Sequence, residues 1–220
     1  QIERIRQIVD AFNIPRMELE GFEADDILGT VAREAAAKGL GVKIITGDRD
    51  LLQLVTDGIV VNLAGSKLSE ARDFTPPDVK EYLGVPPEQV IEYKALVGDA
   101  SDNIPGVAGI GEKSALTLLG AYQNLEEIYQ HLEDIQPRIR NKLEAGHDIA
   151  FLSRKLATIV TDVAINLDLE KARAESFDVE TVEALFRELE FRSLVGRLKD
   201  LKRKVVGSEA SEPLSLLGEQ

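Results

Sequence analysis

The chain has no cysteine, no tryptophan and no long run of consecutive apolar residues. The absence of cysteine excludes disulfides, thiolate zinc sites and thiol nucleophiles, and it is compatible with a reducing cytoplasm. A membrane span needs roughly 18 or more consecutive apolar residues, and the N-terminus has no basic segment followed by an apolar one. We therefore expect a cytoplasmic protein without a membrane partner.

Basic residues are also scarce, because 26 Lys and Arg stand against 39 Asp and Glu and give a formal net charge of −13. This excess of acid argues against a nucleic-acid partner, since phosphates normally need a basic surface. Acids that are clustered to hold divalent cations, however, reverse the local field once the cations bind. The positions of the acids are therefore more informative than their number.

The first part of the chain has the pattern of an α/β fold. Apolar spacing predicts helices over residues 1–12 and 23–38, the second ended by Gly39. The β-branched run at 41–46 predicts a buried strand, and 59–63 a second one. Thr75 followed by two prolines predicts the start of a helix that continues to residue 82.

The second part reads as helical, with a helix over 87–97 and short helices from Asn124 onward. We divide the chain into an α/β core at 1–85, a helical subdomain at 86–205 and a linker at 206–220, whose first half is rich in Gly, Ser and Glu. The first residue is Gln1 rather than methionine, and we expect both ends to be cuts from a longer protein.

Three groups of acids lie at element boundaries: Glu23, Asp25 and Asp26; Asp48 and Asp50; and Asp99 and Asp102. Magnesium prefers hard oxygen ligands, and carboxylates from several boundaries suit it. Two such ions about 4 Å apart could hold the attacking and leaving oxygens of a phosphodiester displacement.

Each group also has a structural interpretation. The first could cap a helix and favour its dipole, the second could be a polar turn after a strand, and the third an Asx-rich loop. The sequence alone leaves open whether the three groups converge. The only histidines, His131 and His147, fall in the helical part and are expected at the surface.

A Gly-rich stretch, GVAGIGEK, spans residues 106–113 between two predicted helices. Here backbone N–H groups can approach a phosphate without a Cβ in the way, and the start of the second helix adds its positive dipole end. Lys113 adds a charge. Such a turn can hold a duplex backbone without reading bases, although a helix hairpin with Gly at its turn has the same pattern.

Three segments carry a family resemblance: GFEADDILGTVA, IITGDRDLLQLV and YKALVGDASDNIPGVAGIGEKSALTLL. Together they resemble the 5′-nuclease (5′→3′ exonuclease) domains of bacterial DNA polymerases I, in the flap-endonuclease family. Weaker similarity continues through FRELEFRSLVGRL. The resemblance implies a PIN-like (resolvase-like) α/β core with a parallel sheet, followed by a helical subdomain with a helix–three-turn–helix motif.

The resemblance also implies roles for individual residues. Two Mg²⁺ or Mn²⁺ ions would be held by a ring of acids: Glu23, Asp25, Asp26, Asp48, Asp50, Asp99 and Asp102. Of these, Asp25, Asp48, Asp50 and Asp102 would be catalytic, while Asp26 and Asp99 would hold metal-bound waters. The duplex-binding residues would be Gly106, Val107, Gly109, Ile110, Gly111, Lys113 and Ser114, with a K⁺ ion on carbonyls near Val107 and Ile110.

The implied function is a structure-specific nuclease that cuts 5′ flaps or nicked and junction DNA in replication and repair, fused to polymerase domains. Family members carry an earlier strand, a second upstream aspartate and a basic helical arch, none of which matches this sequence. We therefore expect the C-terminal two-thirds of the nuclease domain. The alternative is a catalytically incomplete fragment that binds duplex DNA, and a ribonuclease of the PIN type is a third possibility that would not need the Gly-rich stretch.

Overall fold

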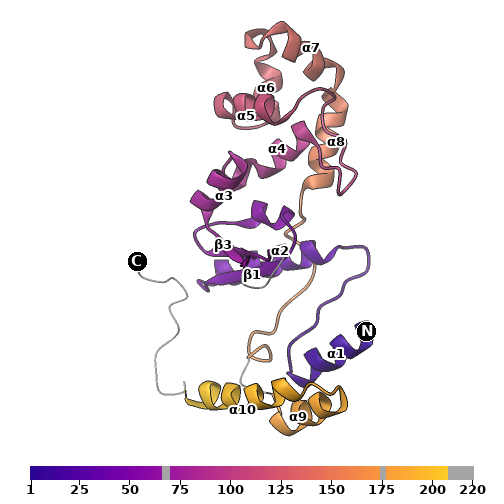
Figure 1. The fold of residues 1–220 in the computed structure, drawn as a ribbon. Helices are drawn as coiled ribbons and strands as arrows, with labels where there is room; N and C mark the ends of the chain where they lie inside the picture. The colour runs from indigo at the N-terminus through magenta and orange to yellow at the C-terminus, as the bar shows by residue number, and fades with distance from the viewer. Residues whose placement is uncertain (66–69, 174–176, 208–220) are drawn as a thin grey trace. The chain divides into compact units, whose positions relative to one another are not determined.

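The computed structural model describes residues 1–65, 70–173 and 177–207. Within them the chain forms two compact units, one from residues 22–163 and the other from residues 1–21 together with the segment that begins at 164. Each unit has its own core. Figure 1 shows the elements of both units.

A sheet of three strands, in the order β1-β2-β3, lies in the larger unit. Strand β1 (Val42–Thr46) pairs in parallel with β2 (Ile59–Leu63), and β2 pairs antiparallel with β3 (Arg72–Phe74). The two longer strands confirm the sequence prediction, whereas β3 was not predicted and makes the described sheet mixed rather than purely parallel. Helix α2 (Ala24–Ala37) packs on β1 and β2.

The predicted burial of β1 was wrong, because Ile44 is its only fully buried residue and Ile45 is 74% exposed. Successive side chains of a strand point to opposite faces. In the described chain β1 is an edge strand, and only the face that carries Ile44 is covered.

Local capping explains where the helices of this region begin and end. Glu23 and Asp26 form a capping box at the start of α2, and Gly39 takes a positive φ of 81° just after its end. Thr75 and Asp78 form the same box at the start of α3 (Pro76–Leu83). Side chains that accept backbone N–H groups stabilise these helix ends, and both helix predictions are confirmed.

The rest of the larger unit is helical, as predicted (Figure 1). The segment predicted as one helix at 87–97 begins with a 3₁₀ turn, η3 (Pro87–Gln89), and continues as α4 (Val90–Val97). A loop leads to α5 (Glu112–Ala121), and four further elements follow: α6 (Leu125–Gln130), η4 (Leu132–Asp134), α7 (Pro137–Ala145) and α8 (His147–Ala157).

One hydrophobic core runs through the larger unit. It joins Val61 of β2 and Leu52 of the 3₁₀ turn η1 (Asp50–Leu54) to Leu96 of α4 and Leu118 of α5. The side-chain amide of Gln53 adds a polar link, because its Nε2 donates to the Ala157 carbonyl at 2.9 Å and its Oε1 accepts from Ile159 N–H at 3.0 Å. The sheet and the helices around α4 are therefore held together.

The smaller unit consists of α1 (Ile2–Ala11), α9 (Val179–Glu188) and α10 (Arg192–Gly207). Phe12 packs its ring against Phe177 and Phe186, at centroid distances of 5.1 and 5.9 Å. Helix α1 matches the helix predicted over residues 1–12, and α9 is one of the short helices expected from Asn124 onward. The domain division at residue 85 stays a prediction, and the predicted linker lies outside the described residues from position 208 onward.

Candidate metal centre and nucleic-acid interface

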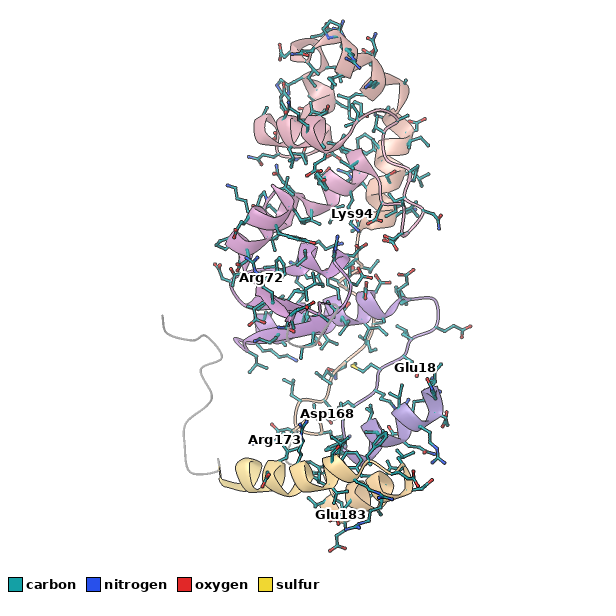
Figure 2. The ribbon with its side chains drawn as sticks, in the orientation of Figure 1. Glu18, Arg72, Lys94, Asp168, Arg173 and Glu183 are labelled. Atoms are coloured by element: carbon teal, nitrogen blue, oxygen red, sulfur yellow. The ribbon has the colours of Figure 1, made fainter. Side chains whose placement is uncertain are left out.

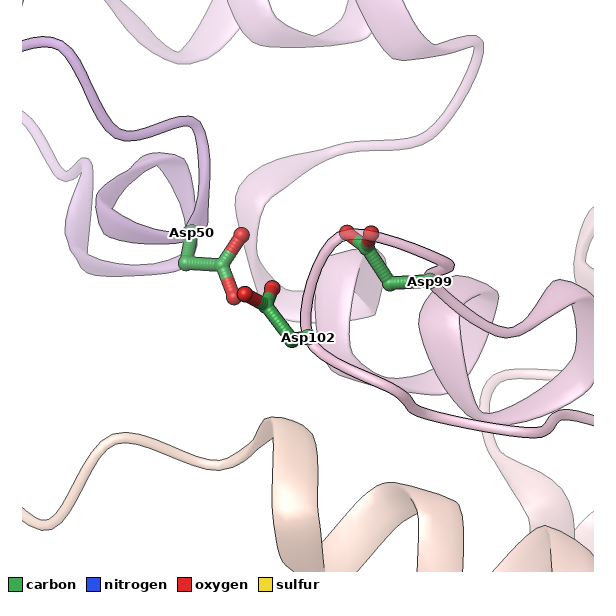
Figure 3. A group of neighbouring side chains, drawn as sticks. All are labelled: Asp50, Asp99 and Asp102. Atoms are coloured by element: carbon green, nitrogen blue, oxygen red, sulfur yellow. The ribbon is translucent and has the colours of Figure 1, made fainter.

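Two of the three acid groups meet near the start of the loop that follows α4. Asp50 belongs to η1, and Asp99 and Asp102 lie in the loop after α4. One carboxylate oxygen from each of these three residues lies within 4.8 Å of the others (Figure 3). Three carboxylates this close can hold a metal ion.

Lys94, which is labelled in Figure 2, forms ion pairs with these carboxylates, and it was not among the residues that we expected in the site. Its Nζ donates to Asp50 and, at 2.8 Å, to Asp99, and it lies 3.9 Å from Asp102. Its side chain is only 10% exposed. Burial alone would lower the pKa of Lys94, but the hydrogen bonds and charges of Asp50 and Asp99 raise it overall. The lysine therefore stays charged and neutralises part of the cluster.

The first acid group joins the cluster through Asp25, in the first turn of α2. Burial, followed by the charges of Asp48, Asp50 and the neighbouring acids Glu23 and Asp26, raises the pKa of Asp25 to about 6. Asp48 and Asp50 are linked directly, because Asp48 Oδ1 accepts the Asp50 N–H at 2.9 Å. The three acid groups of the sequence thus converge in the fold.

The carboxylates differ in how their charge is compensated. Burial also raises the pKa of Asp50; the hydrogen bond and charge of Lys94 act against it, and the charges of Asp48 and Asp102 add smaller increases. Burial acts in the same direction on Asp99, but hydrogen bonds from Lys94 and Ser101 lower its pKa to about 2. Burial thus favours the protonated form at Asp25 and Asp50, whereas hydrogen bonds favour the charged form of Asp99.

The carboxylates of Glu23 and Asp26 accept hydrogen bonds from backbone N–H groups. The Asp26 carboxylate accepts the N–H of Glu23 at 3.1 Å and the N–H of Val160 at 2.8 Å, and the Glu23 side chain accepts the N–H of Asp26. The helix-capping interpretation thus holds for these two residues. Their role beside a metal ion stays a prediction.

The Gly-rich stretch forms the end of the loop between α4 and α5 and the start of α5, with some residues buried and others exposed. Val107 and Ile110 are buried, whereas Gly109, Gly111 and Lys113 are exposed. The N–H of Gly106 donates to the buried Ser153 hydroxyl at 3.1 Å. In the part of the chain that the structure describes, the N–H groups of Gly109 and Gly111 donate to no protein acceptor.

Gly106 packs closely against the Gly98 backbone, and neither position has room for a side chain. A Cβ at Gly106 would lie 2.3 Å from the Gly98 nitrogen, and φ is +62° at Gly106 and +81° at Gly98. Gly106 therefore serves the packing of the loop. The predicted duplex contact depends on its exposed neighbours up to Lys113, and on the half-buried Ser114, at the start of α5.

Comparisons with known proteins agree with this arrangement. Residues 1–84 match the family model "5′-3′ exonuclease, N-terminal resolvase-like domain", and residues 85–180 match "5′-3′ exonuclease, C-terminal SAM fold". The chain is 50% identical to DNA polymerase I of Caldicellulosiruptor bescii over 90% of this chain and 24% of the relative. It is 39% identical to DNA polymerase I of Bacillus subtilis over 98% of this chain and 25% of the relative. The chain thus spans about a quarter of the length of these curated relatives.

Solved structures share the fold. T5 5′-exonuclease with divalent zinc ions bound matches with a TM-score of 0.60 at 24% identity, over 79% of this chain and 61% of that one. The catalytic core of Rad2 in complex with a DNA substrate matches with a TM-score of 0.55 at 19% identity, over 85% of this chain and 63% of that one. These likenesses confirm the expected resolvase-like α/β core followed by a helical subdomain. Among the described residues no helix is long and apolar enough to cross a membrane.

Proposed function

Because the chain belongs to the 5′-3′ exonuclease family, we propose that it is a structure-specific 5′-nuclease that hydrolyses phosphodiester bonds of DNA at 5′ flaps, nicks or junctions. The observation that carries this proposal is the convergence of acids from three separate segments around Asp50. A helix cap, a polar turn and an Asx-rich loop would each explain one segment. None of them explains why the three meet.

The cofactors that we propose are two Mg²⁺ ions, for which Mn²⁺ can substitute. The catalytic ligands would be Asp25, Asp48, Asp50 and Asp102, with Glu23, Asp26 and Asp99 around them. Carboxylate oxygens suit these ions. The raised pKa of Asp25 reflects burial first and then the charges of neighbouring acids, and a cation would offset those charges. When bound, the ions supply positive charge that activates water and stabilises the leaving oxygen.

The side chains of the site have their own tasks in this proposal. Lys94 holds Asp50 and Asp99 in place through hydrogen bonds and offsets part of their mutual repulsion. The Asp26 carboxylate fixes the start of α2 against the segment at Val160, and thereby fixes Asp25 one residue earlier. The backbone N–H of Asp50 orients the Asp48 carboxylate. Preorganised ligands of this kind avoid reorganisation during the reaction.

The duplex next to the cleavage point would lie on the exposed face of the Gly-rich loop. Gly109, Gly111, Lys113 and Ser114 would contact a phosphate, and the carbonyls of Val107 and Ile110 would hold a K⁺ ion that supplies positive charge beside the strand. The unused N–H groups of Gly109 and Gly111 support this proposal. The start of α5 adds a positive dipole end.

The wider role follows from the relatives. Both relatives named above are DNA polymerases I, and we propose that this chain acts beside polymerase domains of its own protein. Removal of 5′ ends ahead of a polymerase would serve replication and repair.

A second candidate function is duplex binding without cleavage. The observation that favours it is Lys94, which already supplies a cation to Asp50 and Asp99 and would have to share them with a metal ion. In that case the loop would bind DNA while the acid cluster remained inactive.

One experiment separates the two functions. Single-turnover cleavage of a labelled 5′-flap DNA by this chain is measured in Mg²⁺ and K⁺, with an EDTA control and duplex binding followed by fluorescence anisotropy. Cleavage that EDTA abolishes supports the nuclease, and binding without cleavage supports the second candidate.

The acid cluster is tested by Asp102→Ala, which should lower the cleavage rate about 100-fold or more, because a lost ligand weakens metal-assisted catalysis. Asp57→Ala is the matched control, since Asp57 is exposed in the turn before β2. A cleavage rate that is unchanged in Asp102→Ala would remove this residue from the site.

A further inference from the structure

The exposed tip of the Gly-rich loop is held by a side chain that lies 33 residues further along the chain. Lys142, on α7, donates from Nζ to the carbonyl oxygen of Gly109 at 2.6 Å. Gly109 is exposed and has a φ of +80°. Within the described residues this is the only hydrogen bond that the Gly109 carbonyl accepts.

Two glycines let α7 approach the loop this closely. A Cβ at Gly109 would lie 3.0 Å from both Cε and Nζ of Lys142, in the space that the end of the lysine occupies. At the end of α7, a Cβ on Gly146 would lie 2.7 Å from a methyl group of Val107. The end of α7 and the loop thus fit together at two separate points.

The ammonium group of Lys142 forms a hydrogen bond with the loop rather than an ion pair with an acid. In the described part of this acid-rich chain, no carboxylate lies within ion-pair distance of Lys142, whereas Arg140 on the same helix pairs with Glu133 at 2.5 Å. Hydrogen bonds from a charged donor are stronger than those between neutral groups. The contact is therefore well suited to fix the peptide group of Gly109.

We propose that Lys142 is a positioning residue for duplex DNA, an inference that rests on the proposed function of the loop. Its ammonium group fixes the Gly109 peptide, so the N–H groups of Gly109 and Gly111 are held in one arrangement before a phosphate arrives. Three other residues of the stretch are already fixed, since Val107 and Ile110 are buried and Gly106 is bonded to Ser153. Preorganisation of this kind raises affinity by lowering the ordering cost of binding.

The test compares Lys142→Met with Lys142→Arg and with a matched control, Lys155→Met, which removes an exposed charge from the neighbouring helix α8. Binding of the full chain to a blunt DNA duplex is measured by fluorescence anisotropy in Ca²⁺ and K⁺ at several salt concentrations. We expect Lys142→Met to weaken binding about tenfold, the size of one charge-assisted hydrogen bond. Lys142→Arg should keep most of the affinity, and Lys155→Met all of it.

The salt dependence distinguishes positioning from direct phosphate contact. A lysine that binds a phosphate contributes about 0.9 to the slope of log affinity against log salt. A positioning residue leaves that slope unchanged, so the slopes of Lys142→Met and wild type should coincide. Amide spectra should show shifted Gly109 and Gly111 signals in Lys142→Met, with the signals of α4 and α5 unmoved, which establishes that the variant is folded.

Two results would overturn the inference: wild-type affinity in Lys142→Met, or weaker binding with a slope that falls by about one charge. Failure of the proposed function gives a different outcome. If the wild-type chain does not bind duplex DNA at all, the proposed role of the loop fails, whatever the variants do.

Discussion

At the scale of single residues, Asp25 is the member of the acid cluster whose protonation should respond most to pH. Its raised pKa of about 6 comes first from burial and then from Asp48, Asp50 and two further acids. In the unfolded chain the same group has a pKa near 3.8. Between these two values the folded protein binds a proton that the unfolded chain has released.

We therefore predict that Asp25 makes the metal-free protein less stable as pH rises from about 4 through 6. The sign follows from linkage, because a group that binds its proton more tightly in the folded state favours folding at low pH. The measurement is urea unfolding in EDTA at several pH values, for wild type and Asp25→Asn. The variant should lose this part of the pH dependence and be the more stable protein at pH 7. Asp57→Asn serves as the control, and parallel pH profiles for wild type and Asp25→Asn would refute the prediction.

The sequence identified the acids of the cluster but missed Lys94. Acids at element boundaries can be recognised from spacing alone, because sheet and helix ends gather at one edge of an α/β fold. Lys94 lies instead within an apolar helix, VIEYKALV. A single lysine in such a helix is normally expected to face solvent. The distance of five residues from Lys94 to Asp99 was a usable signal, since a side chain in the last turn of a helix can reach the loop that follows.

At the scale of elements, α4 connects the helices around it through a second buried charge, Glu92. Its Oε2 accepts the N–H of Leu125 at 3.1 Å, and its Oε1 lies 3.4 Å from Arg154, which also pairs with Glu126. Burial raises the pKa of Glu92, and the Leu125 and Arg154 partners act against it. The carboxylate thus ties α6 and α8 to α4.

Glu92→Ala should lower the free energy of unfolding by about 1–3 kcal/mol, because it leaves the buried N–H of Leu125 without an acceptor. Glu92→Gln should cost less, since its amide oxygen can still accept that hydrogen bond. Urea unfolding checks both, with Glu88→Ala, on the exposed side of η3, as the control. Equal losses for the Ala and Gln variants would contradict this account.

The loop between α4 and α5 gives a second prediction at this scale. Gly106→Ala should destabilise the protein by roughly 2–4 kcal/mol, because a methyl group would overlap the Gly98 backbone and φ is positive. Gly120→Ala, near the end of α5 with nothing within 4 Å of its new Cβ, is the matched control and should be close to neutral. Thermal unfolding of both variants measures the difference. Similar melting temperatures for the two would mean that the loop can shift to accept a side chain.

Helices and strands that are marked by residues within their own segment could be predicted from the sequence. Those that depend on pairing with another strand could not. The capping box and prolines of α3 and the β-branched run of β2 identify these elements within the segment itself. Strand β3 has only three residues, Arg72–Phe74, and is recognisable only beside β2. There Asp73 accepts hydrogen bonds at 2.6 Å from both Asn62 and Lys43, contacts that depend on strands earlier in the chain. The edge position of β1, and so the exposure of Ile45, likewise depends on neighbours.

At the scale of the whole molecule, the described chain has two cores that should respond separately to mutation. Phe186 is 6% exposed in the smaller unit, where it packs against Phe12 and Phe191. Phe186→Ala should lower the free energy of unfolding of this unit by about 3–5 kcal/mol, because packing is lost. We predict faster amide hydrogen exchange in α1, α9 and α10 of this variant and unchanged exchange in α4 and α5.

Leu96→Ala is the counterpart in the larger unit, because Leu96 is fully buried in the core that joins the sheet to the helices. It should speed exchange throughout residues 22–163 while α9 keeps its protection. Faster exchange across both units in either variant would mean that the two cores unfold together.

The smaller unit is built from the two ends of the described chain, and this has a consequence for the order of events during synthesis. Residues 22–163 can fold as they leave the ribosome, since their core needs nothing that is translated later. Helix α1 is translated well before α9, the helix on which it packs. At about 5–20 residues per second, α1 waits roughly ten to thirty seconds for its partner. During that time its exposed isoleucines are a natural binding site for chaperones.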